Sequence, residues 1–334
     1  MRILYGIQGT GNGHISRARA MLPALSKFAH IDILISGKNY SADLGFPVRY
    51  RKNGLSYTFG KNGGIDFWDS AKKFRPIQFI KDIREIPVED YDLVISDFEP
   101  LTAWACASKD ISCIGLSHQA AFSSLKTPRP PVQEKLGELI FRNYAPCDVP
   151  LGIHYQDYDD FIFTPMIRPA IREAKVNREN HISVYLPAFD DRLLLSKFRP
   201  LTETHFHIFS RSRRKITHFK NITIFPVSGR EYIESITSSK GMILASGFES
   251  TSEALYLGKR LFTIPMKNQY EQACNASALK QFGATVVSEI TDSFTEEIFH
   301  WLGSPQPQRI HFPEVTDKIA ACIFEWQSMH SLTA

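Results

Sequence analysis

The sequence alternates short apolar runs, each about the length of a β-strand, with longer segments that have helical spacing. Strands that are apolar along their whole length are typical of parallel sheets, which are buried on both faces. Alternation of such strands with helices predicts an α/β fold with parallel sheets. In the first half, the predicted strands are 2–7, 31–36, 91–96 and 112–116, and the clearest predicted helices are 14–28 and 100–109.

The second half repeats this architecture, so we expect two Rossmann-like domains. The length of 334 residues agrees, because one domain takes roughly 150 residues. Residues 164–180 contain two prolines and many charges, and we take them as a linker between domain 1–163 and domain 181–312. A last segment, 313–334, should form a helix that packs on the first domain. The second half has predicted strands at 181–186, 205–209, 222–225, 242–245, 261–264 and 285–287, and predicted helices at 190–198, 229–238, 250–257, 270–281, 294–302 and 315–327.

Composition and charge argue against several classes of protein. The 39 Lys and Arg residues against 35 Asp and Glu give a formal charge of +4, which is too weak to favour nucleic acid. Five cysteines without a C-x-x-C pair indicate a reducing cytoplasm and no structural zinc. No apolar run approaches the ~20 residues of a membrane span. Glycines stand where a secretion signal would need apolar residues, so we expect none.

The first predicted strand runs into a glycine-rich turn that ends in a histidine. Gly9, Gly11 and Gly13 alternate with polar residues, and His14 follows directly. Such a turn lets the backbone approach a ligand closely. The dinucleotide fingerprint G-x-G-x-x-G would need a further glycine at position 14 or 16, and neither position has one. Binding of NAD, with Asp32 as the ribose ligand, therefore stays a weaker alternative.

His14 is a candidate general base. It stands at the start of a helix, where the positive end of the helix dipole disfavours the imidazolium form, and a neutral imidazole suits a base. A base of this kind needs a carboxylate to orient it, and Asp97 follows the 91–96 strand. The alternatives are a structural histidine and an Asp97 that caps the 100–109 helix. Glu99 is a weaker substitute for Asp97.

A second group of polar residues follows the 242–245 strand. Gly247 makes a turn, and Ser250 and Thr251 begin the next predicted helix, where backbone N–H groups and hydroxyls can bind a diphosphate. Glu253, one turn further on, can accept hydrogen bonds from paired ribose hydroxyls. The alternative is a capping box formed by Ser250 and Glu253. After the 261–264 strand come three more polar side chains that can hold sugar hydroxyls, Gln269, Glu271 and Gln272.

At these residues the chain resembles the glycosyltransferases of the GT-B fold. The segment S-G-F-E-S-T-S-E-A-L-Y-L-G-K-R-L-F-T-I-P, followed by E-Q-A-C-N-A, is similar to their donor-binding region, and G-T-G-N-G-H is similar to their glycine loop and catalytic histidine. The UDP-glycosyltransferases, the N-acetylglucosaminyltransferase of peptidoglycan synthesis and an uncharacterised microbial subgroup are the most similar. Plant members carry a phosphate-binding His at the position of Ala245 and an Asn at that of Glu249.

The resemblance implies two Rossmann-like domains that face each other across a cleft, and a role for each matching residue. His14 matches the inverting general base and Asp97 its carboxylate partner. Gly247, Ser250 and Thr251 match the diphosphate loop. Glu253 matches the ribose ligand, and Glu271 and Gln272 match the pair that contacts the donor sugar. The implied activity is metal-independent, inverting transfer of a sugar from a nucleotide-sugar, best a UDP-sugar, to an acceptor hydroxyl. The nucleotide-sugar is a co-substrate and no cofactor is expected.

Other functions stay open on the same scaffold. A nucleotide-sugar hydrolase or epimerase would use the same histidine, and a non-catalytic nucleotide-sugar binding protein would not need it. Two stretches that interrupt the α/β pattern, 51–84 and 123–134, are candidates for recognising the acceptor. The stretches Trp68–Phe79 and Arg211–Lys215 are consistent with peripheral contact with the inner face of a membrane, which a lipid-linked acceptor would require.

Overall fold

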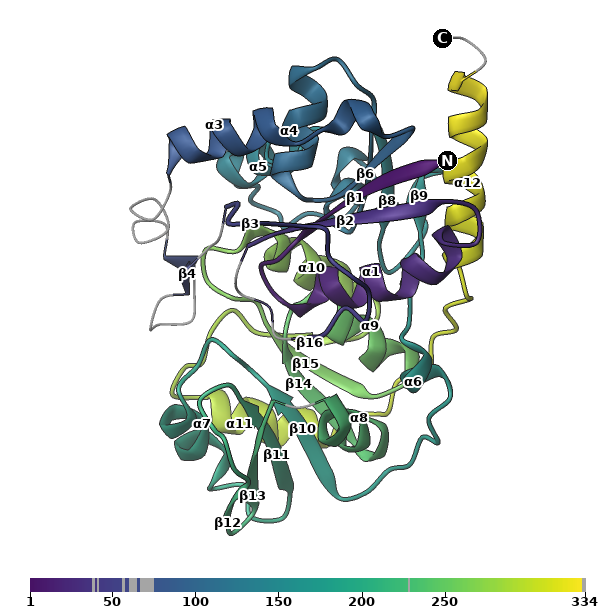
Figure 1. The fold of residues 1–334 in the computed structure, drawn as a ribbon. Coiled ribbons are helices and arrows are strands. Elements are labelled where there is room, and N and C mark those ends of the chain that lie inside the picture. Colours follow the sequence, from purple (N-terminus) through teal and green to yellow (C-terminus); the bar gives the residue numbers. More distant parts are fainter. Residues whose placement is uncertain are drawn as a thin grey trace.

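The computed structural model describes residues 1–37, 40, 42–55, 58–59, 65–66, 75–227 and 229–331. Two seven-stranded sheets dominate it, one in each half of the chain. We call the elements around the first sheet the N-terminal lobe and those around the second the C-terminal lobe. Figure 1 shows the N-terminal lobe above the C-terminal lobe, with helices on the faces of both sheets.

The sheet of the N-terminal lobe is entirely parallel and has the order β3-β2-β1-β6-β7-β8-β9. Its strands are β1 (Arg2–Gln8), β2 (His30–Ser36), β3 (Tyr50–Lys52), β6 (Leu93–Asp97), β7 (Cys113–Ser117), β8 (Val149–Ile153) and β9 (Ile162–Phe163). The central strands are buried on both faces, as their apolar composition requires. The helices of this lobe are α1 (Asn12–Leu25), α3 (Pro76–Glu85), α4 (Pro100–Ser108) and α5 (Lys135–Asn143), with 3₁₀ turns η1 (Val88–Asp90) and η2 (Gln119–Ser123).

The sheet of the C-terminal lobe has the order β12-β13-β11-β10-β14-β15-β16 and is parallel except for β12 at its edge. Its strands are β10 (His181–Tyr185), β11 (His205–Ser210), β12 (Thr217–Phe219), β13 (Ile222–Pro226), β14 (Gly241–Ala245), β15 (Arg260–Ile264) and β16 (Thr285–Val286). The helices are α6 (Pro169–Arg172), α7 (Asp191–Phe198), α8 (Gly229–Ser238), α9 (Phe248–Tyr256), α10 (Tyr270–Gln281) and α11 (Phe294–Leu302). A separate two-stranded ribbon pairs β4 (Thr58–Phe59) with β5 (Ile65–Asp66).

The last helix, α12 (Thr316–Ser331), returns to the N-terminal lobe and lies beside α1 (Figure 1). Lys27 and Asp317 form an ion pair at 2.7 Å, and the rings of Phe28 and Phe324 lie 5.0 Å apart. Gln327 donates a hydrogen bond to the backbone oxygen of Asp92 at 2.8 Å. The chain therefore crosses between the lobes twice.

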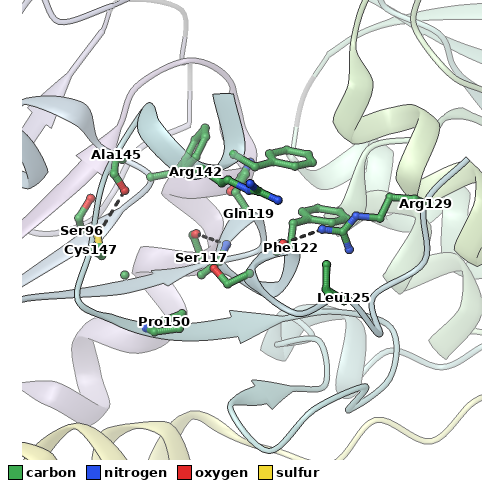
Figure 2. A pocket seen from close by; sticks show the side chains of 15 residues that line it. Ser96, Ser117, Gln119, Phe122, Leu125, Arg129, Arg142, Ala145, Cys147 and Pro150 are labelled. Carbon is green, nitrogen blue, oxygen red and sulfur yellow. Dashed lines mark hydrogen bonds between the residues drawn. The ribbon is translucent and has the colours of Figure 1, made fainter. Parts of the chain in front are cut away.

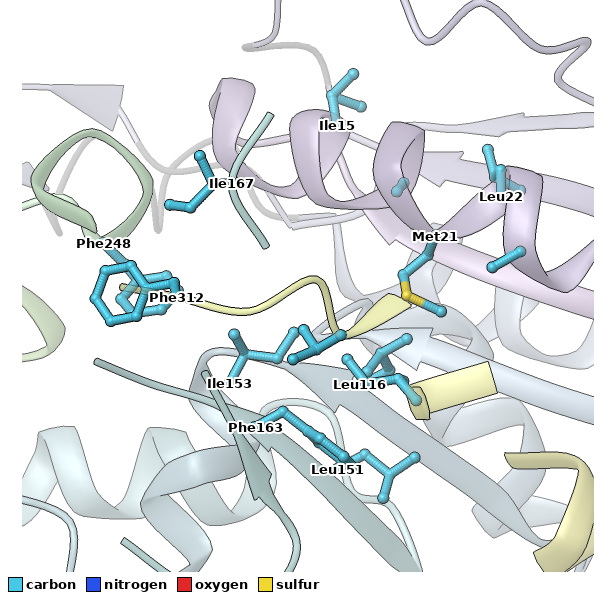
Figure 3. Packing of buried hydrophobic residues seen from close by; sticks show 14 of the residues in the cluster. Ile15, Met21, Leu22, Leu116, Leu151, Ile153, Phe163, Ile167, Phe248 and Phe312 are labelled. Carbon is cyan, nitrogen blue, oxygen red and sulfur yellow. The ribbon is translucent and has the colours of Figure 1, made fainter. Parts of the chain in front are cut away.

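One hydrophobic cluster is continuous across both lobes. It includes Met21 of α1 and Leu116 of β7 from the N-terminal lobe, and Phe248 of α9 from the C-terminal lobe (Figure 3). Ile171 of the connecting segment and Phe312, which precedes α12, are fully or almost fully buried in the same cluster. Because burial of apolar area stabilises roughly in proportion to that area, this cluster holds the two lobes in contact.

Candidate functional site

The strand order of each sheet reverses at one point, and ligands of open α/β sheets bind outside the carboxyl ends of the strands at such points. The reversal lies between β1 and β6 in the N-terminal lobe and between β10 and β14 in the C-terminal lobe. The glycine-rich turn follows β1, Asp97 is the last residue of β6, and the turn into α9 follows β14. The two groups of residues that the sequence singles out therefore lie at the expected ends of both sheets.

The glycine-rich turn is in direct contact with the C-terminal lobe. Gly11 caps α1 with a φ of 113°, in the region that favours glycine. Gly13 faces α9, where a Cβ at position 13 would lie 2.6 Å from Oε2 of Glu249. Gly9 donates its backbone N–H to Ser36 at the end of β2, at 2.6 Å. The turn of one lobe and the first turn of α9 of the other are thus packed against each other, and only a glycine fits at position 13 without displacing Glu249.

His14 and Asp97 form a hydrogen-bonded pair. Nδ1 of His14 lies 2.8 Å from Oδ1 of Asp97, which is fully buried. Arg17, one helical turn after His14, donates to both oxygens of the same carboxylate, with Nε 2.9 Å from Oδ2 and Nη2 2.7 Å from Oδ1. Burial by itself would raise the pKa of Asp97, but the charges of Arg17 and His14 and their hydrogen bonds outweigh it and lower that pKa. Asp97 is therefore an ionised acceptor at neutral pH.

This arrangement can orient a base. Nδ1 of His14 lies 2.8 Å from Oδ1 of Asp97 and also 2.8 Å from Nη2 of Arg17, so the tautomer decides whether it donates to Asp97 or accepts from Arg17. When Nδ1–H donates to Asp97, the lone pair of the neutral ring is on Nε2, the nitrogen that can take a proton from a ligand. The side chain of His14 keeps 12% of its surface exposed, so the ring is held without being sealed off. Arg17 also donates from Nη1 to Oε1 of Glu249 at 2.6 Å. The same guanidinium thus connects the His14–Asp97 pair to α9.

The interpretation of Asp97 as a helix cap is wrong. The residue that caps α4 is Glu99, whose carboxylate accepts from the backbone N–H groups of Leu101 and Thr102 at 2.8 and 2.7 Å. Glu99 also accepts from Ser36 at 2.5 Å, and its burial raises its pKa. It is held away from His14 by these partners, so it does not replace Asp97.

The first turn of α9 differs from its predicted form. The helix begins at Phe248 and Gly247 is its cap, so Ser250 stands one turn inside the helix and the capping box with Glu253 does not form. Ser250 is partly exposed and its hydroxyl donates to the oxygen of Gly247 at 3.2 Å. Thr251 is fully buried, and its hydroxyl bonds the same oxygen at 2.8 Å and the hydroxyl of Tyr155 at 2.7 Å. Of the two hydroxyls, that of Ser250 is the accessible one.

Glu253 has a partner that the sequence did not indicate. Arg168, from the segment that connects the lobes, donates from Nε to Oε1 at 2.5 Å and from Nη2 to Oε2 at 2.8 Å. The side chain of Glu253 is 5% exposed and that of Arg168 is 33% exposed. Both oxygens of Glu253 are therefore engaged, and a positive charge with a solvent-accessible side lies next to α9.

The three polar residues before and at the start of α10 point in different directions. Glu271 faces the N-terminal lobe and accepts from Nε2 of Gln119 in η2 at 2.8 Å. Gln272 is buried and its Oε1 accepts from the backbone N–H of Met266, so it stabilises its own loop. Gln269 caps α10 through its backbone, and its buried Oε1 has no hydrogen-bond partner in the described part of the chain. Glu271 is the member of this group that lies at the contact between the lobes.

Several other residues singled out by the sequence lie elsewhere. Asp32 is at the amino end of β2, bonded to Arg49 and to the hydroxyl of Tyr91, so its assignment as a ribose ligand at the carboxyl end of the sheet is wrong. In the basic run between β11 and β12, Arg213 is paired with Asp191 at 2.7 Å. The stretch Trp68–Phe79 lies mostly outside the described residues.

Two Asp-x-Asp sequences occur, Asp90-Tyr91-Asp92 and Asp157-Tyr158-Asp159. The first precedes the amino end of β6, and the second lies between β8 and β9, where Asp159 is paired with Lys126. Within the described part of the chain, no three His, Cys, Asp or Glu side chains are arranged to hold a metal ion. None of the described helices combines the length and hydropathy that crossing a membrane requires.

Two facing lobes, each with a parallel α/β sheet and with candidate residues at the facing carboxyl ends, define the GT-B fold. The chain belongs to glycosyl transferase family 1, whose family model matches residues 1–303. Family and fold together support sugar transfer as the activity. No curated protein matches the sequence.

Solved structures agree on the fold. MurG from Acinetobacter baumannii is similar with a TM-score of 0.60 and 11% identity, over 97% of this chain and 99% of that one. The spinosyn forosaminyltransferase SpnP has a TM-score of 0.56 and 13% identity, over 98% and 95%. UGT89C1 of Arabidopsis thaliana, solved with UDP, has a TM-score of 0.56 and 13% identity, over 97% and 94%. At these identities the likeness establishes the fold alone.

Proposed function

We propose that the protein is an inverting glycosyltransferase that moves a sugar from a UDP-sugar to an acceptor hydroxyl, with His14 as the general base. The observation that carries the proposal is the contact of Gly13 and Arg17 with Glu249, because it brings the His14–Asp97 pair against the first turn of α9. A base in one lobe and a diphosphate site in the other can then act on the same pair of substrates.

In the proposed reaction, the acceptor hydroxyl attacks the anomeric carbon while Nε2 of His14 takes its proton. Asp97 keeps Nδ1 protonated and stabilises the imidazolium that forms. The bond from the anomeric carbon to the diphosphate oxygen breaks, the configuration inverts, and negative charge grows on the leaving diphosphate. The transition state has oxocarbenium character, as in glycoside hydrolysis.

The leaving group can be stabilised by groups of the chain itself. The backbone N–H groups at Gly247 and the start of α9, with the hydroxyl of Ser250, form a binding site for an anion. Arg168 adds a positive charge beside α9. We therefore propose that a metal is not required. Glu253 would bind the ribose hydroxyls and Glu271 the donor sugar. The carboxylate of Glu253 would then accept hydrogen bonds from both the ribose and Arg168.

The donor is proposed as a UDP-sugar because the chain resembles the UDP-glycosyltransferases at α9 and UGT89C1, which shares the fold, was solved with UDP. The test is a thermal-shift screen of UDP-, GDP-, dTDP- and CDP-sugars. A UDP-sugar at about 100 times its Kd should stabilise the protein by ~2.7 kcal/mol. Ser250→Ala should reduce that shift, whereas Ser196→Ala, on α7, should not. If no nucleotide-sugar stabilises the protein, the proposal fails.

Transfer is separated from hydrolysis by following UDP release with and without acceptors. A transferase releases UDP slowly in their absence and faster when a hydroxyl compound is added. UDP release at full rate in water alone would identify a hydrolase instead. Conversion of the UDP-sugar without release of UDP would identify an epimerase.

A further inference from the structure

Two cysteine thiols of the N-terminal lobe are in contact. Sγ of Cys147 lies 3.7 Å from Sγ of Cys113, although 34 positions separate the two residues in the chain, and neither is part of a disulfide. A disulfide requires side chains that point toward each other and a distance of about 2.05 Å between the sulfurs. The two side chains already have this orientation, so an approach of the sulfurs by about 1.7 Å would allow the bond.

The backbone holds the two thiols in this position. Cys113 is the first residue of β7, and Cys147 lies two residues before β8, which pairs with β7. Asp148 donates its backbone N–H to the oxygen of Cys113 at 3.0 Å, and its carboxylate accepts from the N–H of Cys113 at 2.9 Å. Gly115 leaves the space for Cys147, because a Cβ at position 115 would lie 3.0 Å from Cβ of Cys147. The contact between the thiols therefore follows from the pairing of β7 with the chain that enters β8.

Cys113 is the enclosed member of the pair. It is 1% exposed and belongs to a cluster of buried apolar residues that also contains Cys106 of α4. Hydrogen bonds with the thiols of Cys106 and Cys147, together with burial, hold the pKa of Cys113 well above its usual value. Because oxidants react with thiolates, Cys113 is protected from direct attack by an oxidant in solution.

Cys147 is the accessible member of the pair. It is partly exposed and lines a cavity of about 250 Å³ together with Ser96, Gly115 and Ala145. Figure 2 shows its sulfur on the Ser96 and Ala145 side of this cavity, at the left of the view. The thiol donates to the backbone oxygen of Ala145 at 3.4 Å. Hydrogen peroxide is close in size to a water molecule, which takes about 30 Å³, so it can reach this sulfur through the cavity.

An accessible cysteine beside a second cysteine that can form a disulfide with it is a common arrangement of redox-sensitive sites. We propose that a hydroperoxide oxidises Cys147 and that Cys113 then forms a reversible disulfide with it. In a reducing compartment the two residues remain thiols until the oxidant arrives. The disulfide forms independently of the proposed sugar transfer.

The proposed disulfide would constrain one segment of the N-terminal lobe. It would close residues 113–147 into a covalent loop that contains η2 and α5. Gln119 of η2 lies in this loop and donates to Glu271 of the C-terminal lobe at 2.8 Å. Oxidation would therefore act on a part of the chain that takes part in the contact between the lobes.

The proposed reaction balances over two steps. The thiolate of Cys147 attacks the terminal oxygen of the hydroperoxide, the S–O bond forms and the O–O bond breaks. The alkoxide or hydroxide that leaves takes up the thiol proton of Cys147, which gives an alcohol or water and a sulfenic acid on Cys147. The sulfur of Cys113 then attacks that of Cys147, the S–S bond forms, the S–O bond breaks, and hydroxide leaves with the proton of Cys113 as water. The two thiols lose two electrons, which reduce the peroxide.

The test is a peptide map of the whole protein after oxidation. Reduced protein is freed of reductant, treated with hydrogen peroxide, alkylated and digested with trypsin without further reduction. Trypsin cuts after Lys109, Lys126 and Arg142, so the three cysteines of this lobe lie in different peptides. We expect linked peptides that contain Cys113 and Cys147, an intact chain lighter by two hydrogens, about 2 Da, and the loss of two thiols. Dithiothreitol should restore all five thiols of the chain.

Variants assign the role of each cysteine. Cys147→Ser should remove the linked peptides, and Cys113→Ser should remove them while leaving Cys147 as a sulfenic acid that dimedone traps. Cys322→Ser removes a partly exposed cysteine on α12 and is the matched control, so it should form the link at the rate of the wild type. Cys106→Ser should form the link as well.

The wild-type peptide map decides the proposal even where a variant does not fold. Absence of the linked peptides in the wild type overturns it, whether Cys147 stays a thiol or becomes a sulfinic acid. A link between Cys106 and Cys113 also overturns it. So does the loss of two thiols from Cys147→Ser at the rate of the wild type.

Discussion

Each lobe places a buried carboxylate next to the contact between the lobes, and each carboxylate is held by an arginine through two hydrogen bonds. In the N-terminal lobe, Arg17 holds Asp97, and both side chains are almost completely buried, at 4% and 0% exposure. In the C-terminal lobe, Arg168 holds Glu253, and a third of the arginine side chain is exposed. The two pairs have the same chemistry but different surroundings.

The difference indicates different roles. Asp97 has a second partner, His14, so the Arg17–Asp97 pair also fixes the orientation of the imidazole ring. Glu253 has no further side-chain partner among the described residues, and Arg168 is reached by solvent. A ligand can therefore share or replace a bond of the Glu253 pair, whereas the Asp97 pair should not change when substrates bind. The predictions below test this contrast.

The largest stability effect should come from Asp97→Asn. The substitution removes the buried carboxylate that binds Arg17 through two hydrogen bonds and leaves the partly exposed Glu249 as its remaining carboxylate partner, and breaking a buried pair typically costs about 3–5 kcal/mol. The free energy of unfolding, measured by denaturant titration, should fall by about that amount. Asp110→Asn, at an exposed turn, is the matched control and should change it by less than ~0.5 kcal/mol. A loss below about 1 kcal/mol for Asp97→Asn would show that the Arg17–Asp97 pair does not stabilise the N-terminal lobe.

The loss of unfolding free energy caused by Asp97→Asn should depend on pH. Because the pKa of Asp97 is lowered in the folded protein, its contribution is present above the ordinary carboxyl value of about 4 and is lost as the pH falls through the lowered value. The difference in unfolding free energy between the wild type and Asp97→Asn should therefore be constant from pH 7 to about pH 4.5 and shrink below that. A difference that shrinks already between pH 7 and 5 would contradict the direction of the shift.

Glu253→Gln should destabilise less than Asp97→Asn, by about 1–2 kcal/mol, because the remaining charge on Arg168 can be solvated. It should also weaken binding of a UDP-sugar, while Asp97→Asn should leave that binding within about 2-fold. Both variants are compared on one donor titration. Equal effects on donor binding would remove the distinction between the two pairs.

The smallest effect should come from the ion pair between Arg17 of α1 and Glu249 of α9. Glu249 is 35% exposed and bonds Arg17 across the lobes, so Glu249→Gln should cost about 1 kcal/mol or less. The cost should decrease in high salt. Glu234→Gln, which removes a fully surface-exposed pair with Arg230, gives the reference for an ion pair within one helix. A loss of unfolding free energy above ~3 kcal/mol would mean that Glu249 acts as part of the buried Arg17–Asp97 pair.

The sequence predicted those parts whose signal is local. Ten of the fourteen strands in the two sheets were predicted, because their apolar runs follow from burial on both faces, whereas the short strands β3, β9 and β12 were missed. His14 and Asp97 could be singled out because each directly follows a predicted strand. β8 was missed because Pro150 and Gly152 interrupt its apolar run, and α5 because Gly137 lies inside it.

The partners were not predicted, for two different physical reasons. Arg17 is one helical turn after His14, so helical spacing alone would have placed the two side chains on the same face of α1. Arg168 meets Glu253 from 85 residues away, and nothing in the local pattern marks one arginine of a charged linker. The start of α9 was placed two residues late because serine is a common cap, whereas the backbone of Gly247 takes that place here.

The central claim is that a base in the N-terminal lobe acts on a donor bound in the C-terminal lobe. It is tested most directly by measuring donor Kd and UDP release, with a mixture of hydroxyl acceptors, on the same samples of wild type and His14→Ala. We expect the Kd to stay within about 2-fold and UDP release to fall about 10²–10⁴-fold. UDP release by His14→Ala at the rate of the wild type would contradict the claim.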